Sequence, residues 1–170
     1  DDRERAESVA QRVLDPATRA DAAQQLVAWT VLAHTYFDSA RYAEAERAYA
    51  ELTRRLPAGD PLQAEATERL AASVYRQAEA KQAAGDLMGA VQEFRRVAVV
   101  APSSPTRAAA EFDAATILIG AGEWTEAASV LEGFRRDHPG HALQAEVTRK
   151  LAVAYLEGGR SAAAAVEFER

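Results

Sequence analysis

The chain lacks cysteine altogether, and it has only one methionine and two tryptophans among its 170 residues. Without cysteine it can form no disulfide, no thiolate metal ligand and no thiol nucleophile. It has no apolar run of the roughly eighteen residues that a membrane-spanning helix needs. Glycine-rich phosphate loops, nucleophile elbows and zinc-binding helix motifs are also missing from the sequence. We therefore expect no enzymatic activity, no catalytic residues and no insertion of this chain into a membrane.

Basic residues are outnumbered, with 20 Lys and Arg against 26 Asp and Glu, which gives a formal net charge of -6 at pH 7. This acidic balance disfavours nucleic acid and anionic membrane surfaces as main partners. The chain begins at Asp1 without a methionine and stops inside an expected helix. We therefore expect it to be part of a longer protein, so that the missing signal peptide says nothing about location.

Strand-forming patterns are missing as well, because β-branched residues are few and no alternation of apolar and polar residues appears. Alanine, the strongest helix former, makes up about a quarter of the chain. The composition therefore predicts an all-α protein.

A pattern of small, aromatic and proline residues recurs along the chain in constant register. The turns after four expected helices fall at Ala40, Gly85, Gly122 and Gly159. Seven residues before each turn stand Ala33, Ala78, Ala115 and Ala152. Five residues after each turn stand Ala45, Ala90, Ala127 and Ala164. Nine residues after each turn stand Tyr49, Phe94, Leu131 and Phe168, and seventeen after the first three stand Pro57, Pro102 and Pro139. Such alanines let helix backbones approach closely, and the large residues fill the space beside them.

This pattern resembles the tetratricopeptide repeat (TPR) family, in which a helix, a tight turn and a second helix are closed by a proline. The resemblance covers nearly the whole chain and implies a right-handed α-solenoid, a single domain over residues 1–170. It implies about 3.5 repeats over 16–57, 61–102, 105–139 and 141–170, with residues 1–14 forming a helix left from a preceding repeat. One such unit cannot bury its apolar face alone, so neighbouring units must stack.

The spacing of the turns predicts where the helices lie. We expect first helices over 16–40, 61–84, 105–121 and 141–158, and second helices over 42–56, 87–100, 124–137 and 161–170. Successive turns lie 45, 37 and 37 residues apart, against about 34 in the common TPR. We therefore expect the first helices of repeats one and two to be about two turns longer than the others and to project beyond the stack.

The long period resembles that of bacterial envelope TPR proteins, notably the outer-membrane assembly lipoproteins and the Tol-Pal coordinator. That resemblance implies a periplasmic or outer-membrane-associated protein, with the cytoplasm as the alternative location.

The TPR resemblance also implies a binding site, because partners of that family contact the first helices along a concave groove. The positions of this chain that match the family's contact positions are His34, Phe37, Asp38, Tyr75, Glu79, Gln82, Phe112, Thr116, Ile119, Arg149, Val153 and Leu156. Several are apolar, which suits an extended or helical peptide. The alternative is that some of these side chains pack against the next repeat or an upstream helix. A clamp for a peptide carboxylate is not expected, because only Arg149 could serve in it.

Two further groups of residues have simple interpretations. His138 and His141 lie in one loop, but a metal site needs three or four ligands and His34 is about a hundred residues away. We therefore expect no metal and no cofactor. The pairs Arg54-Arg55, Arg95-Arg96 and Arg135-Arg136 could form a basic ridge, but cations near helix C-termini are also favoured by the helix dipole.

The sequence thus favours a protein-protein interaction scaffold that binds a partner protein or peptide. Two alternatives remain open. The repeats could be a structural spacer or self-association module, or they could recruit substrate for a larger enzyme.

Overall fold

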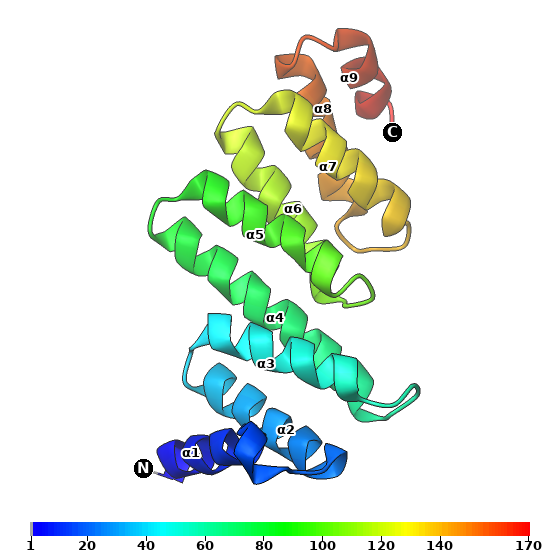
Figure 1. Cartoon of the computed structure of the whole chain (residues 1–170). Helices are drawn as coiled ribbons and strands as arrows, with labels where there is room; N and C mark the ends of the chain where they lie inside the picture. Colours follow the sequence, from blue (N-terminus) through cyan, green and yellow to red (C-terminus); the bar gives the residue numbers. More distant parts are fainter. Residues whose placement is uncertain (1) are drawn as a thin grey trace.

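The computed structural model describes residues 2–170, and over that range all its regular secondary structure is helical (Figure 1). The elements are α1 (Asp2–Leu14), the short 3-10 helix η1 (Pro16–Thr18), α2 (Ala22–Asp38), α3 (Tyr42–Arg55), α4 (Leu62–Ala83), α5 (Leu87–Val100), α6 (Thr106–Gly120), α7 (Trp124–Asp137), α8 (Gln144–Glu157) and α9 (Ser161–Phe168). Each α-helix packs against its neighbours in the sequence. The termini lie at opposite ends of the stack. The predicted all-α solenoid is confirmed.

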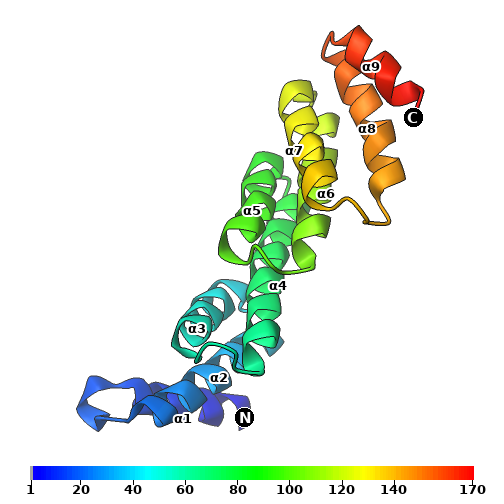
Figure 2. The same ribbon diagram turned by 90° about the vertical axis from the view of Figure 1, so that its right-hand side faces the viewer.

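The helices form two layers. First helices (α2, α4, α6 and α8) alternate along the chain with second helices (α3, α5, α7 and α9). Figure 2 shows α3, α5 and α7 along one side of the stack and α4, α6 and α8 along the other. No helix of residues 2–170 is long and apolar enough to cross a membrane.

The repeated alanines are among the most deeply buried positions of the fold. Each is at most 1% exposed: Ala33, Ala45, Ala78, Ala90, Ala115, Ala127, Ala152 and Ala164. Their methyl groups occupy so little room that the paired helices can lie close together. The large residues nine positions after the turn fill the adjoining space, and the first three are equally buried: Tyr49, Phe94 and Leu131. The fourth, Phe168, is 67% exposed, because no described helix packs over the end of α9.

The turn between the two helices of each repeat requires a left-handed backbone residue. Its φ is +56° at Ala40, +82° at Gly85, +77° at Gly122 and +75° at Gly159. This conformation lets the next N–H donate to the carbonyl five residues before it, as Arg41 does to Tyr36 at 2.9 Å. Glycine adopts it without steric cost, whereas alanine does not.

The first helix of repeat one begins later than expected. A helix over 16–40 was predicted, but α2 starts at Ala22. The Asp15 carboxylate accepts a hydrogen bond from the Ala17 N–H and so caps the start of η1. Arg19, with a φ of +51°, ends η1. Asp21 and Gln24 form a capping box that starts α2. The Asp15-Pro16 signal therefore caps a short turn rather than the long helix.

The prediction of two long first helices is correct for repeat two alone. α4 has 22 residues, whereas α2 has 17, α6 has 15 and α8 has 14. α4 also projects less than expected: Leu62 is 44% exposed, but Ala66 and Leu70 are buried against the first repeat. From Ala71 onward α4 packs into the core of the later repeats. The long α4 therefore joins two hydrophobic clusters. The remaining differences from the predicted bounds are small: α8 begins at Gln144 instead of residue 141, and α9 ends at Phe168 instead of residue 170.

The second helices are joined by a series of ion pairs, which we call the second-helix ladder. Its three rungs are Glu46–Arg96 between α3 and α5, Arg95–Glu126 between α5 and α7, and Arg135–Glu167 between α7 and α9. Two of the three predicted arginine pairs therefore supply the rungs. The remaining pair, Arg54 and Arg55, is bonded to Glu51 within α3. The arginines bind carboxylates of this chain instead of forming an open basic ridge.

We predict that Ala40→Gly stabilises the protein by about 0.5–1 kcal/mol, because it removes the steric cost of a left-handed alanine. The backbone entropy that glycine adds to the unfolded chain offsets only part of this gain. Gly85→Ala should have the opposite effect, since nothing lies within 4 Å of the added Cβ and only its φ is strained. The matched control is Gly120→Ala, at the end of α6 in open space without a positive φ. Urea unfolding midpoints check all three. A destabilising Ala40→Gly would show that the turn is not strained.

We predict an acid-sensitive attachment of α9. Glu167 is 7% exposed and accepts hydrogen bonds of 2.7 and 2.8 Å from Arg135, which lower the pKa of Glu167. A lowered carboxyl pKa contributes stability above the ordinary value of about 4.3, and that stability is lost as the pH falls through the lowered value. Glu167→Gln should therefore weaken hydrogen-exchange protection of α9 at pH 7, by about 1–2 kcal/mol.

The difference in hydrogen-exchange protection of α9 between Glu167→Gln and the wild type should shrink below about pH 4. The matched control is Glu169→Gln, because Glu169 is exposed just beyond α9. A difference that is the same at pH 7 and pH 3 would mean that the ion pair does not hold α9.

Candidate functional site

The twelve predicted binding residues all lie on the first helices, and we call them the first-helix face. They are His34, Phe37, Asp38, Tyr75, Glu79, Gln82, Phe112, Thr116, Ile119, Arg149, Val153 and Leu156. The structure brings them onto the successive helices α2, α4, α6 and α8, but it gives them different surroundings. Three aromatic residues of the set are partly buried between repeats, whereas the aliphatic residues on α8 are exposed.

Phe37 lies between its own repeat and the next. Its ring meets Tyr42 and Tyr49 of α3 edge to face, with centroids 5.6 and 6.3 Å apart. The Arg69 guanidinium of α4 lies 5.0 Å from the Phe37 centroid. Edge-to-face rings and a cation over a ring face are favourable geometries. Phe37 therefore couples α2 to both α3 and α4.

Tyr75 and Phe112 repeat this arrangement one and two steps later. The Tyr75 ring lies 5.0 Å from that of Phe94 in α5, and its hydroxyl donates to Asp113 in α6. Phe112 lies 6.4 Å from Phe134 in α7, with the Lys150 ammonium of α8 5.2 Å from its centroid.

We call Phe37, Tyr75 and Phe112 the aromatic keys. Each fills the groove between the second helix of its repeat and the next first helix. The packing alternative considered from the sequence thus describes their contacts, while a role in binding stays a prediction.

His34 is held by packing as well. Its Nδ1 lies 3.1 Å from the Tyr49 hydroxyl, and the two rings meet edge to face. Burial raises the pKa of Tyr49 to about 12, which keeps the hydroxyl protonated. The hollow beside them, between α2 and α4, measures about 10 Å³. That volume holds no more than a water molecule, so His34 does not open onto a ligand cavity.

The accessible part of the first-helix face is concentrated towards the C-terminal end. Val153 and Leu156 on α8 are 43% and 48% exposed. Arg149 is exposed beside them and forms an ion pair with Glu146. Thr116 on α6 is also exposed. These residues offer an apolar patch with polar groups around it.

Three of the four remaining residues of the set offer polar groups. Asp38 and Gln82 are exposed near the ends of α2 and α4. Glu79 is half-buried and bound to Arg76 at 2.8 Å, and Ile119 packs against the hydrophobic core.

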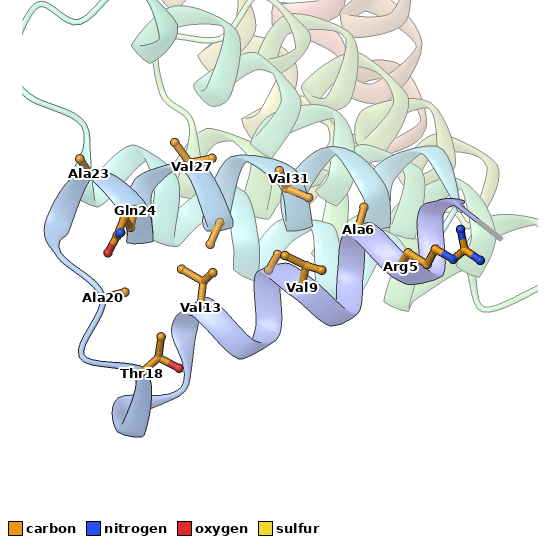
Figure 3. Close-up of a pocket in the computed structure, with 12 residues that line it drawn as sticks. Arg5, Ala6, Val9, Val13, Thr18, Ala20, Ala23, Gln24, Val27 and Val31 are labelled. Carbon is orange, nitrogen blue, oxygen red and sulfur yellow. The ribbon is translucent and has the colours of Figure 1, made fainter.

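The structure also reveals a surface that the sequence did not predict, which we call the N-terminal groove. It lies between α1 and α2, has a volume of about 670 Å³ and is almost wholly apolar (Figure 3). Its lining residues are Arg5, Ala6, Val9, Ala10, Val13, Thr18, Ala20, Ala23, Gln24, Val27, Ala28 and Val31. Figure 3 shows the two helices diverging towards η1. The spacing of Val9 with Val13, and of Val27 with Val31, was the available sequence signal, since residues four apart share a helix face.

The loop histidines belong to a packed cluster. His138 Nε2 lies 3.0 Å from a Glu111 carboxylate oxygen, and both histidine rings contact Phe134. Within residues 2–170, no three His, Asp or Glu side chains are grouped so that they could hold a metal ion.

Comparison with known proteins adds little to this geometry. The chain matches no protein-family model and no curated protein. Among solved structures it is similar to the nearly identical TPR-like repeats of a predicted kinesin light chain from Podosopora anserina, with 20% identity and a TM-score of 0.43. A second crystal structure of those repeats gives 19% identity and a TM-score of 0.42. Both alignments cover 98% of this chain and 84% of the other. Similarity at this level supports no argument about function.

We predict that Tyr75→Phe destabilises the protein by about 1–2 kcal/mol, because it removes a hydrogen bond to the Asp113 carboxylate and leaves that carboxylate half-buried. A double-mutant cycle with Asp113→Ala, which removes the acceptor, checks the pairing, and additive effects would contradict it. Burial and the nearby Asp113 raise the pKa of Tyr75. The contribution of the Tyr75 hydroxyl to stability should therefore be complete below the ordinary tyrosine pKa of about 10 and be lost only at higher pH.

Proposed function

We propose that this chain is a protein-protein interaction scaffold that performs no chemical step. A segment of a partner protein lies across the exposed side chains of α6 and α8. Val153 and Leu156 are its apolar anchors, and Thr116 and Arg149 supply polar contacts. The partner segment is apolar, with an acidic residue to meet Arg149.

The observation that carries this proposal is the exposure of Val153 and Leu156, because the other ten residues of the first-helix face are packed or polar. Neighbouring exposed aliphatic side chains rimmed by polar groups are typical of binding surfaces. The aromatic keys support the proposal indirectly. Since they fill the spaces between repeats, they hold the first helices in a constant arrangement, and a pre-organised surface loses less entropy on binding.

The test uses a random-peptide library displayed on phage and selected on the wild-type chain. We predict that the selected peptides bind Val153→Asp/Leu156→Asp at least about tenfold more weakly, because two apolar anchors are replaced by charges that repel the acidic residue of the peptide. Dissociation constants from fluorescence polarisation give the comparison.

The matched control is Val99→Asp, since Val99 on α5 is 79% exposed and lies outside the first-helix face. Peptides that bind wild type and the double variant equally well would contradict the proposed face. Peptides that lose binding to Val27→Asp instead would move the site to the N-terminal groove.

We also propose a bacterial cell-envelope setting, periplasmic or outer-membrane-associated. Its support is the 37- and 45-residue spacing of the turns. Fractionation of the native host that finds the protein in the cytoplasm would contradict this proposal.

A further inference from the structure

A cleft lies within the stack, where the end of α1 and the loop that follows it face α3 across Trp29 of α2. It consists of two hollows of about 310 and 430 Å³. Both hollows are lined by Leu14, Asp15, Pro16 and Trp29, so the contact of this loop with Trp29 separates them. We call the two hollows together the Trp29 cleft. Its walls come from α1, η1, α2, α3 and the loop between η1 and α2.

The junction between α1 and α3 is bridged only at one end. There Arg41, which precedes α3, pairs with Glu7 of α1 at 2.9 Å. The later second helices are joined by the rungs of the second-helix ladder. Within residues 2–170, no hydrogen bond or ion pair joins residues 14–20 to α3. The Trp29 cleft is therefore the part of this junction that the chain leaves unbridged.

The indole N–H of Trp29 is a donor without an acceptor. Its Nε1 is buried, and it is the one buried side-chain nitrogen or oxygen of residues 2–170 that has no hydrogen-bond partner. A tryptophan N–H can only donate, and a buried one usually has an acceptor because an unpaired donor is costly. A ligand oxygen would supply that acceptor. It reaches the N–H once a side chain of the cleft rotates, a change that is common on binding.

The carboxylates of the Trp29 cleft are already bonded within the chain. Its charged lining residues are Asp15, Arg19, Glu44, Arg47 and Arg55. Asp15 accepts a hydrogen bond from the Ala17 N–H, and Glu44 pairs with Arg41 at 3.1 Å. Neither carboxylate is then left to pair with the arginines of the cleft.

Two of the three arginines in the cleft have no carboxylate partner. Arg19 and Arg47 form no ion pair within residues 2–170, whereas Arg55 pairs with Glu51 and lies 5.7 Å from the Trp29 ring centroid. Arg19 also has a φ of +51°, a conformation that residues other than glycine rarely adopt and that is often found at ligand sites. In a chain of net charge -6, the cleft is a local excess of positive charge.

We propose that the Trp29 cleft binds a short acidic segment of a partner protein, in which a carboxylate stands beside an apolar side chain. The carboxylate meets Arg19 or Arg47, because hydrogen bonds between charged groups are the strong ones. A second oxygen of the segment accepts from the Trp29 N–H, and the apolar side chain contacts Leu14 and Pro16. Each hollow has the volume of a small-ligand site, which suits a few extended residues. The site uses none of the twelve residues of the first-helix face.

The two tryptophans make a selective test possible. In an isotope-labelled chain the indole N–H groups of Trp29 and Trp124 each give one NMR signal, and Trp29→Phe identifies the first. The probe is the blocked tripeptide Glu-Leu-Glu, and its matched control is the blocked tripeptide Gln-Leu-Gln. Glu-Leu-Glu should move the Trp29 indole proton downfield with a dissociation constant of about 1 mM or below, because that proton gains an acceptor. The Trp124 signal should stay in place.

Two variants test the arginines. Arg19→Gln and Arg47→Gln should each weaken binding of Glu-Leu-Glu at least about fivefold, since each removes a charged donor. The matched control is Arg12→Gln, which removes the same charge from an exposed position of α1 outside the cleft and should bind as wild type. All three side chains are exposed, and an unchanged Trp124 signal shows that each variant is folded.

Four results would overturn the proposal. A Trp29 signal that does not move in excess Glu-Leu-Glu would mean that water satisfies the donor. Equal binding of Gln-Leu-Gln would show a site that does not select charge. Wild-type binding by both Arg19→Gln and Arg47→Gln would exclude the arginines. The same shift with inorganic phosphate alone would show a simple anion site. None of these results depends on the peptide binding proposed for the first-helix face.

Discussion

The close approach of helices at the repeated alanines is the constraint on which the rest of the structure depends. Ala33 and Ala45, and their equivalents in the later repeats, are completely or almost completely buried. A larger side chain there would push the two helices of a repeat apart, and overpacking of this kind is destabilising. Once the helices are close, the connecting turn must reverse the chain within very few residues. That short reversal requires the left-handed residue at Ala40 and the three glycines.

The two layers of helices are joined from one repeat to the next by different interactions. The first helices are coupled through aromatic rings such as Phe112, and the second helices through ion pairs such as Arg135–Glu167. Nearly every link joins adjacent repeats, so the stability of the stack is a sum of local terms. The long α4 strengthens one of these junctions, because its first half packs into one cluster and its second half into the other. What remains exposed on the first helices is then free to bind a partner.

The repeat architecture could be predicted because it depends on residues in constant register. Each of these residue types indicates its own place: alanine a close helix contact, glycine a left-handed turn and proline the end of a repeat. The start of α2 was mispredicted because two signals competed. Asp15-Pro16 is a strong helix start in isolation, but the capping box of Asp21 and Gln24 stabilises a later one. For Phe37 the sequence left binding and packing against the next repeat as two open alternatives, and its contact with Arg69 of the next repeat could not be predicted from local patterns. The N-terminal groove was missed for the same reason, because it depends on how α1 lies against α2.

A stack of repeats has two ends, and each must be covered or remain exposed. Within residues 2–170, one apolar hollow lies between α1 and α2, and another lies between α8 and α9, where Val153 and Phe168 both contribute to the lining. The apolar side chains of the first-helix face on α8 therefore continue onto α9, so a partner segment that meets Val153 would also lie beside Phe168.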